Sequence, residues 1–325
     1  MNKISDIAIV GAGPIGLSIA IAAARKRIDY LVLEKSMLVH SIYHFPTNMT
    51  FFSTATELEL GGLPFICQGQ KPTRAEALQY YRRVAQYFDL NIRYDAHVMG
   101  IEKEDGYFSL LLKNGEKVRA KNTVLASGYY DHPNLLNVPG ENLPKVSHYY
   151  KESHLYFAKK VVVIGGRNSA AEAALEIYRT GGEVTLVHRG SGFDDKVKYW
   201  VRPDIENRIA RGEIKAYFNS NVVKIEEKSV TIRTKNGELL TIENDYVLAL
   251  IGYHPDVDLM RRAGVRVDDE TLVPQHNPET LETNVAGLYV AGALTVGREA
   301  NKVFIENGRL HGEQVVTAIA KKLAS

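Results

Sequence analysis

Cysteine is almost absent from this sequence. Cys67 is the single cysteine among 325 residues, so no disulfide can form within the chain. There is no Cys-X-X-Cys pair, which excludes a dithiol relay within one chain, and no His or Cys spacing suggests a metal site. We expect Cys67, in the loop-like segment GGLPFICQGQ, to be a small half-buried residue, although a redox role stays open.

Strong net charge and long apolar runs are also lacking. The chain has 40 Lys and Arg against 38 Asp and Glu, without a basic block, so no nucleic-acid partner is indicated. No apolar stretch approaches the roughly 20 residues that span a bilayer. The N-terminal residues lead directly into a predicted strand and leave no room for a signal peptide. We therefore expect a cytoplasmic protein without a membrane partner. Hydrolase chemistry has no support, because no Gly-X-Ser-X-Gly motif is present.

The sequence does contain two glycine-rich loops, each between an apolar strand and a helix. The first follows the strand at 7–10 and consists of Gly11, Ala12, Gly13, Pro14, Ile15 and Gly16. Gly11 allows a tight turn, Gly13 lets the backbone approach a pyrophosphate, and Gly16 lets the helix pack closely. The helix N-terminus then offers free N–H groups and the positive end of its dipole to the phosphates.

An acidic residue completes the first site. Glu34 ends the next predicted strand, 23 residues after Gly11. A carboxylate at this place binds the ribose hydroxyls of an adenine dinucleotide and would repel a 2′-phosphate. FAD and NAD therefore both suit the site. By analogy with reductases that bind two dinucleotides, the N-terminal position favours FAD.

The second loop has a different electrostatic character. It consists of Gly165, Gly166, Arg167, Asn168, Ser169 and Ala170. The strand after it ends in His188 and Arg189 without an acid, and Lys196 and Lys198 follow. Cations there suit a 2′-phosphate and favour NADPH over NADH, although a solvated basic loop is the alternative. Arg167 replaces the second glycine, where it could crowd the pyrophosphate or pair with it.

The two halves of the chain share one order of elements. Each has a glycine-rich βαβ unit, a hairpin, a buried strand and a glycine turn, and the hairpin turns are expected at 114–115 and 236–237. A helix is expected at 71–89, and a strand, a loop and a long helix at the C-terminal end. We predict an α/β fold with two Rossmann-like dinucleotide-binding domains. The FAD domain is expected to comprise 1–130 and 254–325, and the NADPH domain 131–253.

Three motifs, GAGPIG, GGRNSA and VAGALTVG, resemble those of the two-dinucleotide flavoproteins that include the thioredoxin reductases. Within this group the chain resembles the bacillithiol-disulfide reductases. The segments that carry this resemblance include SIYHFPTNMTFFSTATELE, QKPTRAEALQYYR and FIENGRLHG, and together such segments cover nearly the whole chain.

The resemblance implies FAD in the N-terminal module and NADPH in the central one. It implies that these residues bind FAD: Gly11, Gly13, Pro14, Ile15, Gly16, Glu34, Lys35, Asn48, Thr50, Val98, Ser127, Gly128, Gly292, Ala293, Lys302, Val303 and Phe304. It implies that these bind NADPH: Gly165, Gly166, Arg167, Asn168, Ser169, Ala170, His188, Arg189 and Gly252.

Two residues depart from the related patterns. Ala293 stands where thioredoxin reductases have an aspartate, so one flavin contact is lost or replaced. Ile15 stands where some bacillithiol-family members carry a cysteine. If that cysteine takes part in the reaction of those proteins, the corresponding step cannot occur in this chain. The fold and the cofactors are unaffected, whereas the disulfide acceptor stays open.

The function expected from these features is an FAD oxidoreductase that takes hydride from NADPH. The acceptor would be a small molecule, preferably a low-molecular-weight thiol disulfide, or a small protein such as ferredoxin or flavodoxin. A flavin monooxygenase and an NADPH sensor are further alternatives, and a homo-oligomer stays open. No catalytic acid or base is assigned. Side chains that could line the acceptor side, or only pack, are Tyr43, His44, Tyr129, Tyr130 and His132.

Overall fold

A computed structural model describes residues 3–324, apart from the side chains of residues 300 and 301. These residues form two compact units. Unit 1 comprises the described residues up to His44, Met49–His132, and those from Tyr253 onward. Unit 2 comprises Phe45–Asn48 and Pro133–Gly252. Each unit contains one of the two glycine-rich loops.

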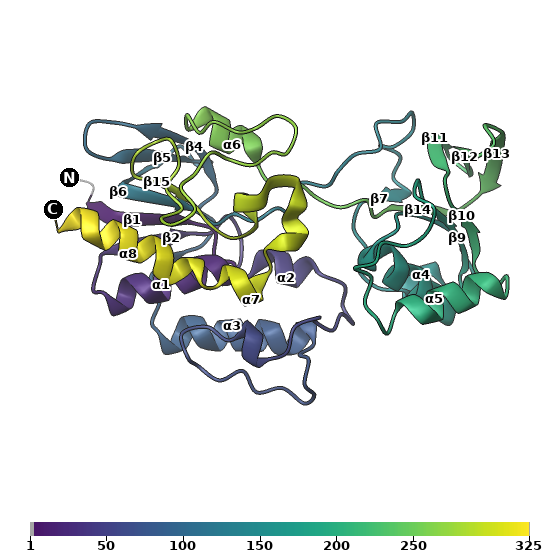
Figure 1. Cartoon of the computed structure of the whole chain (residues 1–325), viewed down its shortest axis with the longest axis horizontal. Helices are drawn as coiled ribbons and strands as arrows, with labels where there is room; N and C mark the ends of the chain where they lie inside the picture. The colour runs from purple at the N-terminus through teal and green to yellow at the C-terminus, as the bar shows by residue number, and fades with distance from the viewer. Residues whose placement is uncertain (1–2, 325) are drawn as a thin grey trace. The chain divides into compact units, whose positions relative to one another are not determined.

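Unit 1 is built on a seven-stranded sheet (Figure 1). The order is β3-β2-β1-β6-β5-β4, and β15 also pairs with β6. Strands β1, β2, β3, β6 and β15 pair in parallel, whereas β4, β5 and β6 pair antiparallel. The strands are β1 (Ile4–Val10), β2 (Tyr30–Leu33), β3 (Ile92–Arg93), β4 (Val98–Lys103), β5 (Phe108–Leu112), β6 (Lys117–Leu125) and β15 (Leu288–Val290).

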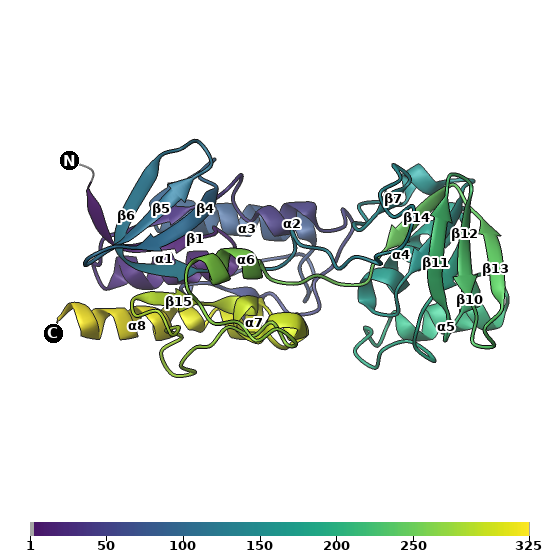
Figure 2. The ribbon, with the colours of Figure 1, turned by 90° about the horizontal axis from the view of Figure 1, so that it is seen from above.

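The helices of unit 1 include α1 and α8, which pack side by side (Figures 1 and 2). Gly312 makes the close approach possible, because a Cβ there would lie 2.6 Å from the Ser18 carbonyl oxygen. The helical segments are α1 (Pro14–Arg25), α2 (His40–His44), η1 (Thr56–Leu58), α3 (Arg74–Tyr87), α6 (Val257–Arg262), η3 (Gly292–Lys302), α7 (Ile305–Gly308) and α8 (His311–Leu323).

Local sequence signals explain where several elements begin and end. Helix α3 starts after Thr73, whose hydroxyl accepts from the Glu76 N–H while the Glu76 carboxylate accepts from the Thr73 N–H. The Asn114-Gly115 turn joins β5 to β6, as predicted. The long C-terminal helix is preceded by the short α7, and residues 309 and 310 keep right-handed helical angles between the two.

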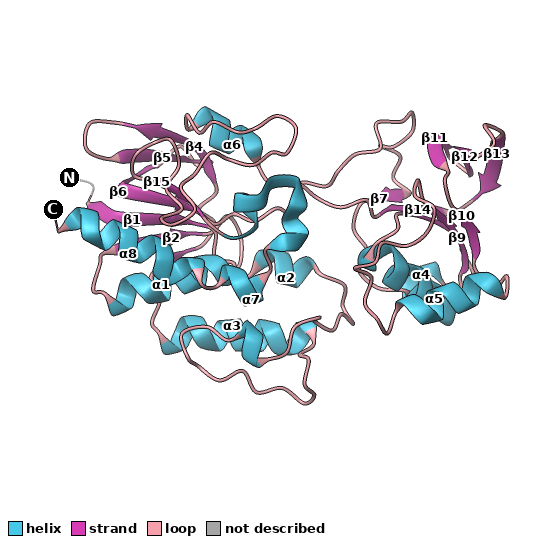
Figure 3. Ribbon diagram, in the orientation of Figure 1, coloured by secondary structure: helices cyan, strands magenta, loops and turns pink. Residues whose placement is uncertain are grey.

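Unit 2 contains a five-stranded parallel sheet, in the order β10-β9-β8-β14-β7, and a three-stranded antiparallel sheet, β11-β12-β13 (Figure 3). The predicted turn at 236–237 joins β12 to β13. The elements are β7 (Val146–Ser147), η2 (His154–Tyr156), β8 (Lys160–Ile164), α4 (Asn168–Thr180), β9 (Glu183–Val187), α5 (Arg202–Ala210), β10 (Lys215–Tyr217), β11 (Asn221–Glu226), β12 (Ser229–Arg233), β13 (Leu239–Glu243) and β14 (Tyr246–Ala249).

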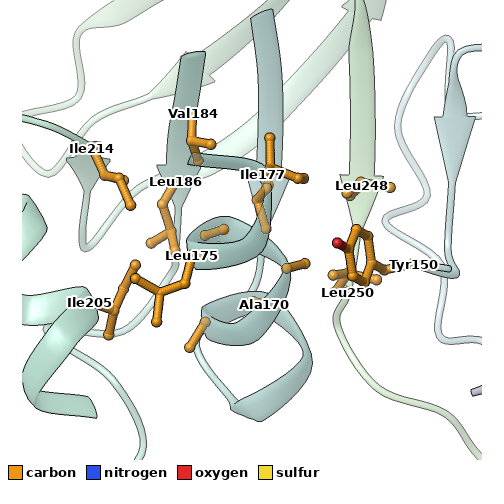
Figure 4. Close-up of a cluster of buried hydrophobic side chains, with 14 of the residues drawn as sticks. Tyr150, Ala170, Leu175, Ile177, Val184, Leu186, Ile205, Ile214, Leu248 and Leu250 are labelled. Carbon is orange, nitrogen blue, oxygen red and sulfur yellow. The ribbon is translucent and has the colours of Figure 1, made fainter. Parts of the chain in front are cut away.

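One hydrophobic cluster of unit 2 lies between α4 and the parallel sheet (Figure 4). Ala170 and Ile177 of α4 are fully buried and belong to one cluster with Leu186 and Leu248 of the strands. Ile205 of α5 completes this cluster. The small side chain of Ala170 in the first turn of α4 lets the glycine-rich loop stay close to the sheet, since a Cβ at Gly165 would already lie 2.9 Å from the Ala170 Cβ.

Candidate functional site

The first glycine-rich loop joins β1 to α1 in unit 1. Gly11 has φ +107°, and a Cβ there would lie 2.6 Å from the Ala126 carbonyl oxygen. A Cβ at Gly16 would overlap the Gly11 carbonyl oxygen. By contrast, a Cβ at Gly13 would meet no heavy atom within 4 Å. The loop is therefore tightly packed at two glycines and open at the third, which suits a bound pyrophosphate.

Glu34 lies beside this loop, directly after β2, and is 4% exposed. Its carboxylate accepts from the Ala12 N–H at 2.8 Å and from the Ser36 N–H at 3.1 Å. Burial raises the pKa of Glu34, although both hydrogen bonds favour the charged form. The structure thus places the predicted ribose-binding acid next to the predicted pyrophosphate loop.

Lys35 and two residues missed by the sequence reasoning form a polar cluster behind Glu34. The Lys35 Nζ lies 2.6 Å from an Asp131 carboxylate oxygen, and the His40 Nε2 lies 3.6 Å from the other. Burial lowers the pKa of His40, and its Nδ1 is buried without a hydrogen-bond partner. No local sequence pattern marks this cluster, because Asp131 is about a hundred residues from Lys35 along the chain.

The end of β15 and the start of α8 form the next wall of the site in unit 1. Gly292 has φ +67°, and its N–H donates to the His311 Nδ1 at 3.0 Å. Ile15 packs here, because a Cβ at Gly292 or at Gly308 would lie within 3.0 Å of Ile15 side-chain atoms. The aliphatic side chain of Ile15 therefore fills the space between these two glycines.

The remaining residues predicted for FAD lie in varied surroundings. Val98 is in the core of unit 1, whereas Gly128, with φ +74°, has open space at its Cβ position, and the half-buried Ser127 precedes it. Ala293 is buried directly after Gly292, and Thr50 forms a β-bridge with Thr73. Of the three C-terminal residues predicted to bind FAD, Lys302 pairs with Glu299, Val303 is half-buried and Phe304 is exposed.

Asn48 requires a correction. The sequence analysis placed it within the first domain, but residues 45–48 belong to unit 2. The Thr47 N–H donates to the Lys151 carbonyl oxygen at 2.7 Å, and this hydrogen bond ties the segment to unit 2. A contact between segments so far apart along the chain leaves no local pattern in the sequence.

The second glycine-rich loop joins β8 to α4 in unit 2. Gly165 has φ +145°, and a Cβ there would lie 2.5 Å from the Leu250 carbonyl oxygen. A Cβ at Gly166 would overlap the His188 imidazole, so this glycine is needed for the ring to lie against the loop. Ser169 is exposed in the first turn of α4. Gly252, with φ +93°, accepts at its carbonyl from the Asn134 N–H at 2.9 Å.

Arg167 and Asn168 both contact a segment that the sequence analysis treated only as a source of lysines. The Arg167 Nε donates to Asp194 at 2.9 Å. The Asn168 side chain donates to the Lys196 carbonyl oxygen at 3.1 Å and accepts from the Lys198 N–H at 2.8 Å. These contacts tie residues 194–198 to the N-terminal end of α4, so the Asn168 side chain positions this segment.

The basic residues near the second loop differ in their availability. Lys198 is 7% exposed and its Nζ lies 2.5 Å from Glu172, so it is not a free cation at the surface. Burial, together with Arg189 and Arg167, lowers the pKa of His188, so the ring is neutral near pH 7. Arg189 is exposed. The sequence predicted several cations near the second loop for a 2′-phosphate. Lys198 is instead paired with Glu172, and the lowered pKa of His188 disfavours its charged form.

The aromatic candidates for the acceptor side all belong to unit 1. The Tyr130 hydroxyl donates to the His44 carbonyl oxygen at 3.1 Å, and the Tyr130 ring lies 4.7 Å from that of Tyr253. Burial raises the pKa of Tyr129. His132 faces Asp256 at 3.9 Å. No group of three or more potential metal ligands occurs among residues 3–324, and no helix in that range is long and apolar enough to cross a bilayer.

Both glycine-rich loops lie within the part of the chain that matches a known protein family. The model of the pyridine nucleotide-disulphide oxidoreductases matches residues 8–292, which include both glycine-rich loops. The chain belongs to this family. A bacilliredoxin reductase, Bdr, of Bacillus subtilis is 44% identical to this pyridine nucleotide-disulphide oxidoreductase over 97% of each chain.

Solved structures agree with this assignment. The bacillithiol disulfide reductase Bdr (YpdA) of Staphylococcus aureus is similar to this oxidoreductase with a TM-score of 0.95 and 41% identity, covering 99% of both chains. That of Bacillus cereus has the same TM-score and identity and covers 98% of this chain and 100% of its own. Ferredoxin–NADP reductases are more distant, for example that of Ignicoccus hospitalis, at 24% identity over 94% of this chain and 95% of its own.

The predicted thioredoxin-reductase-like α/β fold is thereby confirmed, as is the resemblance to the bacillithiol-disulfide reductases. The protein is an NADPH-dependent flavin oxidoreductase with FAD and NADPH as its cofactors. The first glycine-rich loop has two packed glycines and an open one at Gly13, whereas Gly165 and Gly166 of the second loop are both packed and Arg167 follows them.

Proposed function

We propose that this oxidoreductase reduces a low-molecular-weight thiol disulfide of the bacillithiol class, and that no thiol of the protein takes part in the electron transfer. The observation that carries the proposal is the similarity to the bacilliredoxin reductase of Bacillus subtilis along 97% of both chains. When bound, FAD would supply the redox chemistry, namely acceptance of a hydride from NADPH and transfer of the electron pair to the acceptor. The chain contributes binding, orientation and exclusion of water. We also infer a cytoplasmic location.

In this proposal, unit 1 binds FAD and unit 2 binds NADPH. Glu34 binds the ribose, since it lies beside the open glycine loop, and Gly128 and Gly292 allow the backbone to approach the cofactor. In unit 2, the loop from Gly165 to Ala170 approaches the pyrophosphate of NADPH. Arg189 is the exposed cation for the 2′-phosphate.

Ile15 supports direct transfer from the flavin to the disulfide. It occupies the first turn of α1 and packs on Gly292 and Gly308, so no thiol stands there. Cys67 offers no substitute, because burial and the Glu76 carboxylate raise the pKa of its thiol. A small redox protein such as ferredoxin is the second candidate acceptor, since transfer to it needs no protein thiol, and ferredoxin–NADP reductases are among the relatives.

The proposal is tested by anaerobic reduction with NADPH and by steady-state turnover. The acceptors compared are bacillithiol disulfide, glutathione disulfide, ferredoxin, flavodoxin, a quinone and oxygen. We expect bacillithiol disulfide to give the highest kcat/KM. Turnover with ferredoxin or flavodoxin alone would establish the second candidate, and flavin reduction without turnover of any acceptor would indicate an NADPH sensor.

A further inference from the structure

The segment after β9 places a carboxylate beside the predicted phosphate site of unit 2. Asp194 lies close to the second glycine-rich loop, because its N–H donates to the Gly166 carbonyl oxygen at 3.0 Å. Its side chain accepts from the Arg167 Nε at 2.9 Å and from the Lys196 N–H at 2.9 Å. A negative charge at this place is unexpected in a site that must attract the phosphate groups of a dinucleotide.

Arg167 is well placed to bind a phosphate if it is released from this pair. It is the N-cap residue of α4, directly before the first turn that contains Asn168 and Ser169. Its side chain remains 67% exposed, so its other guanidinium nitrogens are accessible to solvent. A guanidinium binds phosphate and carboxylate oxygens with the same donors, so the two anions compete for it.

The carboxylate of Asp194 is charged under ordinary conditions. The Lys196 N–H, followed by the Arg167 side chain, lowers the pKa of Asp194. The hydrogen bonds of Asp194 with the Gly166 carbonyl oxygen and the Lys196 N–H hold its carboxylate near Arg167.

We propose that Asp194 sets the nucleotide affinity and specificity of unit 2 by competing with the nucleotide's phosphate groups for Arg167. The inference rests on the proposed location of NADPH in unit 2. When NADPH binds, Arg167 exchanges its contact with Asp194 for a contact with a phosphate oxygen. The contact with Asp194 that Arg167 must give up lowers the net affinity for the nucleotide.

The test compares two neighbouring aspartates in the FAD-loaded enzyme. Asp194→Asn removes the charge but keeps an oxygen that accepts from the Lys196 N–H. Asp195→Asn is the matched control, because Asp195 is 97% exposed and pairs with Arg202. NADP⁺ and NAD⁺ binding are measured by calorimetry, so that no turnover interferes. We expect Asp194→Asn to tighten NADP⁺ binding about three- to fivefold, the scale of a partly exposed charge contact, and Asp195→Asn to change it less than about twofold.

Arg167→Ala provides the second arm. It should weaken NADP⁺ binding, and in its presence Asp194→Asn should lose most of its gain, because the released guanidinium is no longer there. A gain limited to NADP⁺ assigns the contact to the 2′-phosphate, and an equal gain with NAD⁺ assigns it to the pyrophosphate. An unchanged or weaker affinity in Asp194→Asn, an equal gain in Asp195→Asn, or a gain that persists in the Arg167→Ala background would overturn the inference.

The location of the nucleotide is tested separately with Arg189→Ala. If Arg167→Ala and Arg189→Ala both leave NADP⁺ affinity unchanged, the nucleotide is not at the second glycine-rich loop, and the proposed site itself is wrong. If they weaken binding while Asp194→Asn has no effect, the site stands and the role of Asp194 fails.

Discussion

The Glu34 carboxylate is buried and hydrogen-bonded, and these two features have opposite effects on its charged form. It is almost fully buried, which is unfavourable for a carboxylate, and it accepts from the Ala12 and Ser36 N–H groups, which offsets this cost. The hydrogen bond to Ala12 also ties the end of β2 to the first glycine-rich loop. This hydrogen bond therefore links the proposed ribose site directly to the proposed pyrophosphate site.

Replacement of Glu34 tests its predicted role in binding FAD. Glu34→Gln keeps one acceptor oxygen but removes the charge, and we expect FAD affinity to fall about tenfold, the scale of one charge-assisted hydrogen bond. Glu34→Arg should abolish FAD retention. The measurement is quenching of flavin fluorescence on titration of apoprotein. Glu102→Gln, at an exposed position, is the control, and equal losses in it and Glu34→Gln would contradict the assigned role.

His311 is a second residue whose protonation state matters for the site in unit 1. Its Nδ1 accepts from the Gly292 N–H, so the proton of the neutral ring is on Nε2. Burial and the nearby His276 lower the pKa of His311 below the ordinary value of 6.5. A second proton would remove the acceptor that orients Gly292.

This predicts a loss of stability in acid. Below about pH 6.5 the unfolded chain binds a proton at this histidine more readily than the folded chain, so the free energy of unfolding falls as the pH drops toward the folded pKa. The contribution is fully present above pH 6.5. We expect the stability of His311→Asn, which keeps an acceptor near Gly292, to depend less on pH between 7.5 and 5.5 in urea unfolding. At each pH, the free energy of unfolding of His311→Asn is subtracted from that of the wild type, which removes the contribution of the other histidines with a lowered pKa. If the two proteins show the same dependence of stability on pH, His311 does not contribute to the loss in acid.

At the scale of elements, glycines decide how closely helices approach their neighbours. Helix α8 lies against α1 at Gly312, where a Cβ would be 2.6 Å from the Ser18 carbonyl oxygen and 2.9 Å from the Ser18 Oγ. The two nearest atoms are the backbone O and C of Ser18, so rotation of the Ser18 side chain alone cannot relieve the overlap. Since His311 is the neighbour of Gly312, the same contact also positions the acceptor for Gly292.

Gly312→Ala should therefore shift α8 away from α1. We expect a loss of about 1–3 kcal/mol in the free energy of unfolding, typical of overpacking at a close contact. FAD retention should fall as well, because His311 moves with the helix. Gly100→Ala is the matched control, since a Cβ there meets no atom within 4 Å. Unfolding in urea measures both, and similar stabilities would contradict the packing argument.

The elements and the sites were not equally predictable from the sequence. Apolar runs and the turn glycines predicted the buried strands and both hairpins, because these signals are local. The position of Glu34 beside the first glycine-rich loop could be predicted, because its spacing from Gly11 follows the fold. The contacts of Arg167 with Asp194 and of Gly292 with His311 were missed, since they depend on how loops close in space. The attachment of 45–48 to unit 2 was missed for the same reason.

At the scale of the whole molecule, the redox capacity of the protein is that of its flavin. Cys67 is the one cysteine of the sequence, and its thiol donates to the Gly69 carbonyl oxygen at 2.8 Å. Burial and Glu76 raise the pKa of this thiol, which disfavours the reactive thiolate. The chain therefore has no redox-active disulfide that could store a second pair of electrons in addition to the pair on the flavin.

Anaerobic titration with dithionite or NADPH should end at two electrons per FAD. Cys67→Ser should keep NADPH-dependent disulfide reduction within a few-fold of the wild type, because the serine preserves the donor to Gly69. Uptake of four electrons, or loss of turnover in a folded Cys67→Ser enzyme, would show that a thiol takes part.

The insertion of unit 2 within unit 1 has a consequence for biosynthesis. Apart from 45–48, unit 2 is one continuous stretch, whereas the sheet of unit 1 needs β15 and the α1 face needs α8, which come from residues 288–323. During translation, unit 2 can fold while the edge of β6 and the apolar face of α1 still await their partners. The nascent chain therefore passes through an interval in which an N-terminal half-domain exposes apolar surface, the kind of species that chaperones bind.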